Sequence, residues 1–451
     1  MRVLVQLRPT ELPRASLAAH AEFAEPPIDL GVLTETSLVL DHDFPPVVLP
    51  TVHAPGAVGM ALALGAPADF SFEPPDVSSV VRGSIPDGDG QQAAVGELLA
   101  RPEVMGVFSD PVIATTLTCG GDPPLGDAAD VAARLDCARL HEAGYTGADV
   151  RVAVVDTGIN DRYLQKLQRT ATIDVPNSFT PAGVPTAPGA HQVAHGTMCA
   201  YDVGIAAPAA TFLDHAVLLS RTPGQVQIQG LLSDAVRSFS QLRALLLADR
   251  DTPLVVSNSW GVFDPAWDFP PGHPGNYTDN PSHPFNLIVA TLEDAGADIL
   301  FAAGNCGLEC PDGRCRFTNR PICGANSHPA VLSIAGIDTN DERVGYSSQG
   351  PGRLSAEKPD VCSYTHFKGS EVFGRGEPDS GTSAACPVAA GVVAAIRTQC
   401  PPSALPPAQL RTLIAKTATA FGAPGFDFDY GWGALSPPAL VAGLPGSPQL
   451  P

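Results

Sequence analysis

Short apolar segments recur through the last two thirds of the chain and alternate with helix-like stretches. Segments of this kind are RVAVVD (151–156), TFLDHAVLL (211–219), PLVVSNSW (253–260), DILFAAGN (298–305) and AVLSIAGID (330–338). The helix-like stretches include residues 230–247 and 387–398. Strands that are apolar throughout are buried on both faces, and strands that alternate with helices form parallel sheets. We therefore predict an α/β fold with a doubly wound, mostly parallel sheet and helices on both faces.

Three motifs contain the residue types of a nucleophilic triad. VAVVDTGIN contains Asp156, AHGTMCA contains His195, and DSGTSAACPVAAG contains Ser383. A serine hydroxyl becomes a nucleophile when a base takes its proton, and a neutral imidazole needs an acceptor that fixes its tautomer. Glycine lies within two residues of each of these side chains, where it permits the turn that exposes them. The motifs predict a catalytic triad in the chain order Asp, His, Ser.

The motifs D-T-G, H-G-T and G-T-S-x-x-x-P resemble the three signatures of the subtilisin-like serine proteases, in that family's order. The resemblance covers about residues 145–440. It implies a serine endopeptidase that forms an acyl-enzyme with protein or peptide substrates. Asp156 would orient His195, which would act as general base and then general acid for the nucleophile Ser383. Cys199 in HGTMCA, together with SNSWG and GTSAA, resembles details of kexin-like and proteinase-K-like relatives.

The same resemblance assigns an oxyanion hole and a substrate groove. The backbone N–H of Ser383 and the side chain of Asn305, in FAAGN, would stabilise the oxyanion. SNSWG matches the strand that subtilases lay antiparallel to the substrate main chain. Residues predicted to line the groove are Ser259, Trp260, Gly261 and Gly304.

Other residues near the motifs have plainer interpretations. His191 is predicted to be a solvated loop residue, His215 a core or supporting residue, and Cys199 a small buried thiol. No cofactor is expected for catalysis and no metal ligand at the triad. Structural calcium is common in the family, but no D-x-[DN]-x-[DN]-G loop marks its ligands here.

Residues 1–118 differ in character from the rest. Strand-like MRVLVQL is followed by Pro-rich acidic connections, a short helix with Val95, Leu98 and Leu99 on one face, and the extended segment 104–117. This arrangement is similar to the end of a subtilase propeptide, a small α+β domain whose last strand enters the active site. The N-terminal region could thus act as an intramolecular inhibitor. A fused regulatory domain is the alternative.

The remaining boundaries follow composition. Residues 119–144 are predicted to form a linker and one surface helix that ends at Gly144, before the catalytic domain at 145–440 and a Pro/Gly-rich tail at 441–451. The net charge of −21 argues against nucleic acid and anionic membranes as partners. The N-terminus lacks the long apolar run of a signal peptide, so a cytoplasmic location is expected, with export as the alternative.

Four cysteines cluster directly after Asn305, with the spacing C-x3-C-x4-C-x7-C. They are Cys306, Cys310, Cys315 and Cys323. Two disulfides, a zinc site and free thiols are the three alternatives, because the paired C-x2-C knuckles typical of zinc sites are missing. A disulfide or a zinc ion would hold Asn305 in place.

Two rival functions accompany the protease. One is a silent or self-inhibited subtilase fold that serves as a binding or regulatory module. The other is a protease dedicated to maturing one partner peptide. Because every triad residue type is present, the motifs favour an active endopeptidase.

Overall fold

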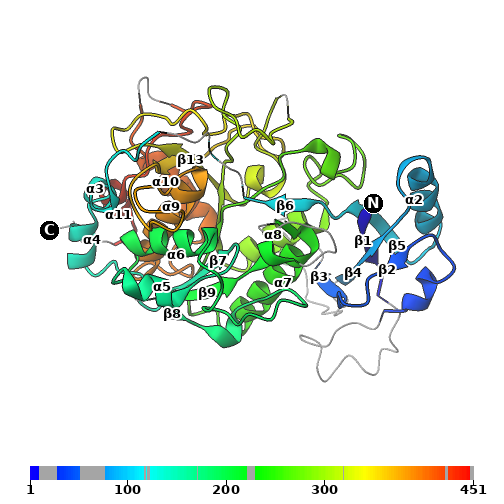
Figure 1. Cartoon of the computed structure of the whole chain (residues 1–451). Coiled ribbons are helices and arrows are strands. Elements are labelled where there is room, and N and C mark those ends of the chain that lie inside the picture. Colours follow the sequence, from blue (N-terminus) through cyan, green and yellow to red (C-terminus); the bar gives the residue numbers. More distant parts are fainter. Residues whose placement is uncertain are drawn as a thin grey trace, which may run out of the picture.

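The computed structural model describes residues 1–9, 28–50, 77–115, 118, 122–169, 171–220, 229–317, 319–421 and 425–446. These residues form two parts, each built around its own sheet (Figure 1). The short strand β6 (Val112–Ala114) reaches from the smaller N-terminal part into the larger one.

The larger part contains a seven-stranded sheet in the order β14-β13-β12-β11-β7-β9-β8, with every neighbouring pair parallel. The strands are β7 (Arg151–Val155), β8 (Thr172–Ile173), β9 (Thr211–His215), β11 (Leu254–Asn258), β12 (Asp298–Ala302), β13 (Leu332–Ile337) and β14 (Val361–Tyr364). The predicted parallel α/β fold is confirmed. All five apolar segments became strands, whereas the short edge strands β8 and β14 were not predicted.

Helices cover both faces of this sheet. Val152 and Val154 of β7 pack into the core with α6 (His195–Ala206) and α9 (Thr382–Arg397). The alternate residues Ala153 and Val155 face the opposite core, which contains α7 (Leu232–Ala248) and α8 (Pro284–Asp294). Successive strand residues point to opposite faces, so a strand between two helix layers must be apolar throughout. Shorter helices complete this part: α5 (Asp161–Lys166), α10 (Pro407–Thr417) and α11 (Pro437–Ala442).

The N-terminal part is an antiparallel sheet with one helix. Its strands are β1 (Arg2–Leu7), β2 (Val39–Leu40), β3 (Val47–Pro50), β4 (Val77–Ser84) and β5 (Val104–Ser109). Helix α2 (Gln91–Leu99) buries Ala94, Val95 and Leu98, while Leu99 is 50% exposed. The prediction for Leu99 was wrong because the buried stripe runs through Ala94 and Leu98, one turn apart, and leaves the next residue on the helix flank.

The N-terminal sheet lies against α7 and α8. Phe44, Leu49 and Phe108 share one hydrophobic core with residues of these two helices. Next to this core, the Asp110 carboxylate accepts hydrogen bonds from the backbone N–H of Ser233 (2.8 Å) and from its hydroxyl (2.9 Å). Ser233 lies in the first turn of α7, where N–H groups lack a helical partner. The N-terminal part thus caps a helix of the larger part.

The single helix predicted before Gly144 is two helices, α3 (Ala128–Arg134) and α4 (Cys137–Glu142). Asp136 separates them with a left-handed φ of 54°, a conformation that aspartate tolerates better than most residues. The single-helix prediction was wrong because the apolar spacing continues across this break.

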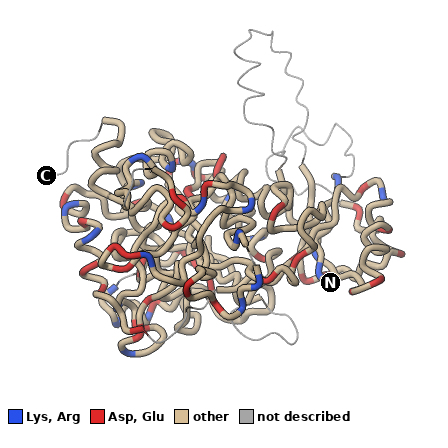
Figure 2. Tube along the Cα trace, turned by 90° about the horizontal axis from the view of Figure 1, so that it is seen from above, with Lys and Arg blue, Asp and Glu red and all other residues tan. Residues whose placement is uncertain are grey.

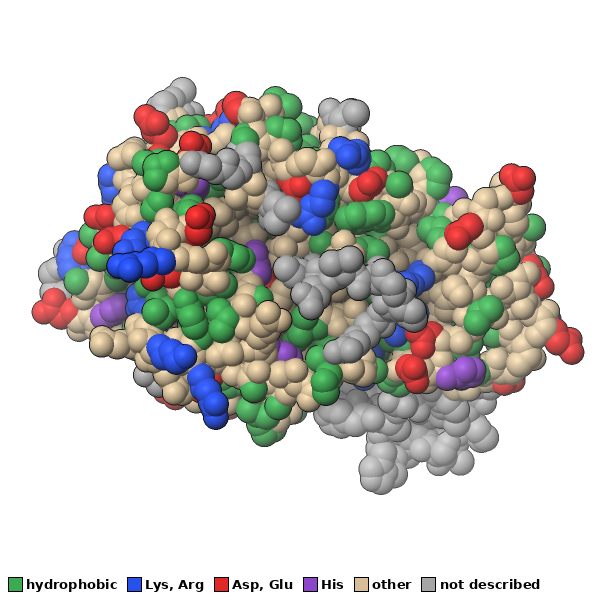
Figure 3. Space-filling view, viewed as in Figure 1, with side chains coloured by type: hydrophobic (Ala, Val, Ile, Leu, Met, Phe, Trp, Pro, Cys, Tyr) green, Lys and Arg blue, Asp and Glu red, His purple; other side chains and the backbone are tan. Residues whose placement is uncertain are grey.

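Charges are spread over both parts of the trace, with acidic residues in excess (Figure 2). On the face seen in Figure 3, acidic and basic side chains are interspersed and hydrophobic groups form small areas. Within the described ranges, no helix is both long and apolar enough to cross a membrane.

Candidate active site

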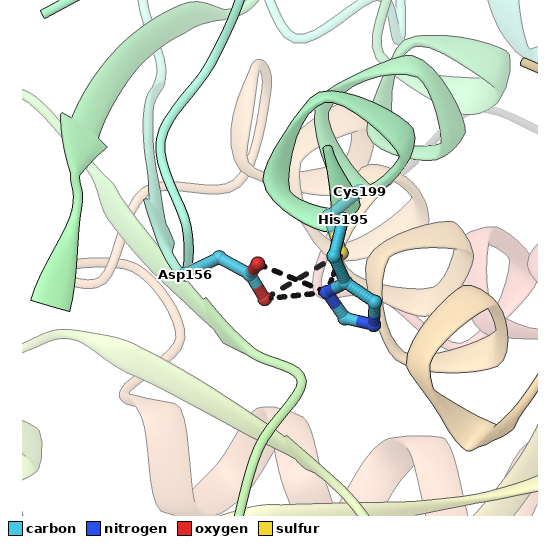
Figure 4. Close-up of side chains that lie close together, drawn as sticks. All are labelled: Asp156, His195 and Cys199. Carbon is cyan, nitrogen blue, oxygen red and sulfur yellow. Dashed lines mark hydrogen bonds and ion pairs between the residues drawn. The ribbon is translucent and has the colours of Figure 1, made fainter. Parts of the chain in front are cut away.

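Asp156 and His195 are hydrogen-bonded at the carboxyl end of the sheet. Asp156 follows the inner strand β7, and His195 is the first residue of α6. His195 Nδ1 lies 2.9 Å from Asp156 Oδ1 and 3.0 Å from Oδ2 (Figure 4). Both side chains are buried. The predicted pairing of these two residues is present, with Nδ1 as the nitrogen that faces the carboxylate.

Glycines allow the close approach of the two segments. A Cβ atom on Gly196 would lie 2.7 Å from the carbonyl oxygen of Gly158, so the start of α6 can approach the Asp156 turn only without a side chain there. Gly158 has a φ of 90°, and a Cβ atom there would overlap the His191 ring. The D-T-G and H-G-T motifs therefore carry their glycines for packing as well as for turns.

Ser383 lies in the first turn of α9, and its carbonyl oxygen lies 3.7 Å from the Sγ of Cys199, which lies on the same helix as His195. Gly381 forms the preceding turn with a φ of 80°, which places the Ser383 N–H among the helix donors that lack a helical partner. Ser383 Oγ lies 3.5 Å from the carbonyl oxygen of Ser259. Among the described residues, the buried Nε2 of His195 has no hydrogen-bond partner. The Ser383 hydroxyl thus faces the Ser259 carbonyl in this structure and makes no hydrogen bond with the imidazole.

Asn305 lies beside the turn before Ser383. Its Oδ1 accepts hydrogen bonds from the Thr382 N–H (2.9 Å) and from the Thr382 hydroxyl (3.0 Å). These bonds orient the amide, since its nitrogen must then face the other way. A Cβ atom on Gly381 would lie 2.7 Å from that nitrogen, which locates the amide donor next to the nucleophile turn.

Cys199 contacts all three segments from beneath. Its Sγ lies 3.7 Å from His195 Nδ1, 3.8 Å from Asp156 Oδ2 and 3.7 Å from the Ser383 carbonyl oxygen. Asp156, His195 and Cys199 are close enough to share a metal ion (Figure 4). Burial, with the nearby Asp156 charge second, raises the pKa of the Cys199 thiol well above its usual value. A protonated thiol is a poor metal ligand, so Cys199 fits its predicted role as buried packing.

A peptide strand lies in the predicted substrate groove. Strand β6 pairs antiparallel with β10 (Gln229–Leu231) along one edge. On its other edge, Ala114 N–H donates to the Gly261 carbonyl (3.2 Å), and Gly261 N–H donates to the Ala114 carbonyl (3.1 Å). Further along, Thr118 Oγ1 lies 3.4 Å from Ser380 Oγ, three residues before Ser383. Thr118 therefore lies beside the turn that precedes Ser383.

The groove residues contribute differently from one another. Gly261 binds β6 through its main chain, and the Ser259 hydroxyl donates to the Ser383 carbonyl (3.0 Å). The Trp260 indole points into the core, where its N–H donates to the Val155 carbonyl (3.0 Å). Trp260 can thus offer the groove only its main chain. β10, the second wall, was missed, because its residues were assigned to the following helix-like stretch.

A small apolar cavity of about 20 Å³ lies between Gly261 and Gly304. Its walls contain no acidic or basic side chain. The lining residues are Trp260, Gly261, Val262, Phe263, Ala302, Ala303, Gly304, Cys306, Pro321, Cys323 and Asn326. Gly304 precedes Asn305, and Gly261 binds β6. The cavity therefore lies between Asn305 and the strand that occupies the groove.

The two neighbouring histidines are both buried. His215 bonds to the Ser238 hydroxyl (2.8 Å), and burial lowers its pKa to about 4, in agreement with the predicted core role. His191 was predicted to be solvated, which is wrong: it is 1% exposed and its Nε2 lies 3.7 Å from Asp214. The reason is the side-chain-free Gly158, which leaves room for the His191 ring behind the Asp156 turn.

In the cysteine cluster, Cys306 and Cys315 form a disulfide. Cys310 is also disulfide-bonded, whereas Cys323 is a free buried thiol that donates to the Val262 carbonyl (3.1 Å). Neither two disulfides within the cluster nor four free thiols describes this loop. A four-cysteine zinc site is incompatible with it as well, because disulfide sulfurs cannot act as thiolate ligands.

Comparison with known proteins matches residues 147–433 to the subtilase family. The chain is 25% identical over 299 residues to subtilisin from Bacillus pumilus, which covers 66% of this chain and 92% of that protein. Subtilisin E from Bacillus subtilis (strain 168) is also 25% identical over 299 residues, which cover 66% of this chain and 67% of that protein. The membrane-bound transcription factor site-1 protease of Homo sapiens is 28% identical over 277 residues, which cover 58% of this chain and 22% of that protein. The family match spans more than half of the chain, and the chain therefore belongs to the subtilase family.

Proposed function

We propose that the protein is a serine endopeptidase with Asp156, His195 and Ser383 as its catalytic triad. The observation that carries this proposal is β6, an extended piece of polypeptide that is hydrogen-bonded on one edge to β10 and on the other to Gly261. A groove that binds main chain through main chain accepts extended peptides of many sequences. Family membership supports the same chemistry.

The reaction begins with a rotation of the Ser383 side chain from the Ser259 carbonyl toward His195 Nε2. His195 then takes the hydroxyl proton while Ser383 Oγ attacks the substrate carbonyl carbon. Asp156, bonded to Nδ1, fixes the tautomer and stabilises the imidazolium. His195 passes the proton to the leaving amine, and water repeats the sequence on the acyl-enzyme. No cofactor takes part in these steps.

The negative charge that forms on the substrate oxygen is stabilised by the Ser383 N–H and by the Asn305 amide. The Thr382 bonds to Asn305 Oδ1 support this role because they orient the amide before the reaction. Donors that are already oriented need no rearrangement in the transition state, which makes them effective.

The apolar cavity supports a preference for small uncharged side chains before the scissile bond. Its volume of about 20 Å³ and the absence of Asp or Glu from its walls disfavour lysine and arginine there. Residues 1–118 act as an intramolecular inhibitor in this proposal, since β6 fills the groove that a substrate would use.

A fluorophosphonate probe on the full-length protein tests the triad. We expect labelling that disappears in Ser383→Ala and persists in Ser380→Ala, a matched change three residues before Ser383. Slow labelling that accelerates once the N-terminal region is removed would fit the self-inhibited form. If Ser383 stays unlabelled even after that removal, the silent binding module replaces the endopeptidase.

A further inference from the structure

Arg314 reaches the strand that occupies the groove. Its Nη2 donates to the main-chain carbonyl of Thr115 at 2.7 Å. Thr115 directly follows Ala114, the residue that pairs with Gly261, and Thr118, three residues later, lies 3.4 Å from Ser380. The contacted carbonyl therefore lies between the paired part of the strand and the nucleophile turn.

The guanidinium is held on two sides before it meets the strand. Asp312, which is buried, accepts from Arg314 Nε at 3.2 Å and from Nη2 at 2.8 Å. The Phe263 ring lies beneath it, with 4.8 Å between the guanidinium carbon and the ring centroid. A planar group fixed by a carboxylate and an aromatic face keeps its N–H directions constant.

The loop that carries Arg314 is itself anchored to the oxyanion side of the site. The Asp312 N–H donates to the Asn305 carbonyl (2.8 Å), and the Arg316 N–H donates to the Phe263 carbonyl (2.9 Å). The disulfide between Cys306 and Cys315 closes the loop. Arg314 is thus held in place by Asp312, by Phe263 and by the closed loop.

From this geometry we propose that Arg314 is a substrate-positioning residue. Its Nη2 donates to the main-chain carbonyl of the substrate residue that follows the one paired with Gly261, in the place that Thr115 takes here. The role rests on the proposed peptidase function. Every substrate has this carbonyl, so the bond strengthens binding whatever the side chain, and it holds the main chain in register close to the scissile bond.

The test combines a change in the enzyme with a change in the substrate. A fluorogenic peptide with the sequence of residues 109–122 is made with a normal amide, or with a thioamide at the residue equivalent to Thr115. Sulfur accepts hydrogen bonds more weakly than oxygen. With the wild-type protein we expect the thioamide to lower kcat/KM about tenfold, because a charge-assisted bond is weakened.

Arg314→Gln should raise KM about tenfold on the normal peptide with little change in kcat, since the bond is already present with the strand at rest. The thioamide should then cause no further loss in this variant. Arg316→Gln is the matched control, because Arg316 lies in the same loop and its side chain donates to the Gly313 carbonyl of that loop. It should behave as wild type with both peptides.

If the thioamide lowers kcat/KM in Arg314→Gln by the same factor as in the wild type, the proposal is overturned. Arg314 would then act only through the loop and not through this carbonyl. A second readout uses the resting full-length protein. Arg314→Gln should speed fluorophosphonate labelling of Ser383 about tenfold by loosening β6, and an unchanged rate counts against the proposal. A wild-type protein that neither cleaves nor labels, even after removal of the N-terminal region, refutes the peptidase function itself, a result distinct from both.

Discussion

Asn305 and Arg314 are each followed by one half of the same disulfide, Cys306–Cys315. One residue is proposed to bind the developing oxyanion, and the other the substrate main chain. The Asp312 N–H bond to the Asn305 carbonyl crosses the same loop. A single covalent closure therefore fixes the distance between the two binding groups.

Breaking this disulfide should affect kcat and KM together. We expect the Cys306→Ser/Cys315→Ser variant to have a lower kcat, because the Asn305 amide is less well oriented. We also expect a higher KM, because the Arg314 side chain is less well oriented. Peptide kinetics with and without a thiol reductant measure both. Cys137→Ser is the control, since Cys137 is a free thiol in α4, outside this loop. A double variant that matches wild type would show that the loop is held without its disulfide.

Removing the Asn305 donor should reduce turnover more than stability. Loss of one oxyanion donor typically lowers kcat by about 10²–10³. We expect Asn305→Ala and Asn305→Asp to show losses of this size, with KM little changed. Asn305→Asp is informative because it keeps an acceptor for Thr382 while it removes the amide donor. Wild-type turnover in Asn305→Asp would exclude the proposed role.

Asp110 should make the inhibited state dependent on pH. Burial raises the pKa of its carboxyl to about 6, against the opposing effects of Arg82 and of the Ser233 hydrogen bonds. The unfolded value is about 3.9, so docking of the N-terminal part takes up a proton. Its stabilising contribution is complete below that value and is lost as the pH rises through about 6.

The corresponding measurement is the fluorophosphonate labelling rate of full-length protein between pH 5 and pH 7. The ratio of the wild-type rate to the Asp110→Asn rate should rise several-fold over this range, because the asparagine does not titrate. Dividing by the variant removes the pH dependence of His195 and of the probe. A constant ratio would mean that Asp110 keeps its charge state on docking.

Gly158→Ala should destabilise the protein more than Gly272→Ala. The two glycines have φ angles of 90° and 79°, so an alanine meets similar backbone strain of about 1–2 kcal/mol at each. Only at Gly158 would the methyl group overlap a neighbour, the His191 ring, whereas nothing lies within 4 Å at Gly272. Urea unfolding of both variants measures the difference, and equal losses would show that His191 moves aside without cost.

The sequence predicted the larger sheet well because its strands are apolar on both faces and are separated by helices. It also predicted the pairing of Asp156 with His195, since the glycines that allow their approach lie inside the same motifs. The residues that mark these features lie inside short segments of the chain.

The features that were missed depend on contacts between distant segments. The buried position of His191 arises from the space left by Gly158, 33 residues earlier. β10 becomes a strand because β6 pairs with it, and Arg314 acquires its role because Thr115 lies within reach. No spacing along the chain marks any of these three, because each partner is supplied by the fold.

The covalent connection of β6 to the rest of the chain determines how it competes with a substrate. A strand joined by a short connection to the groove that it fills is present at an effective concentration on the order of millimolar. A free peptide of equal affinity must reach that concentration to displace it, whatever the concentration of the protein. Cutting the connection changes this competition without altering a single contact, because the strand then becomes an ordinary solute that dilution can remove.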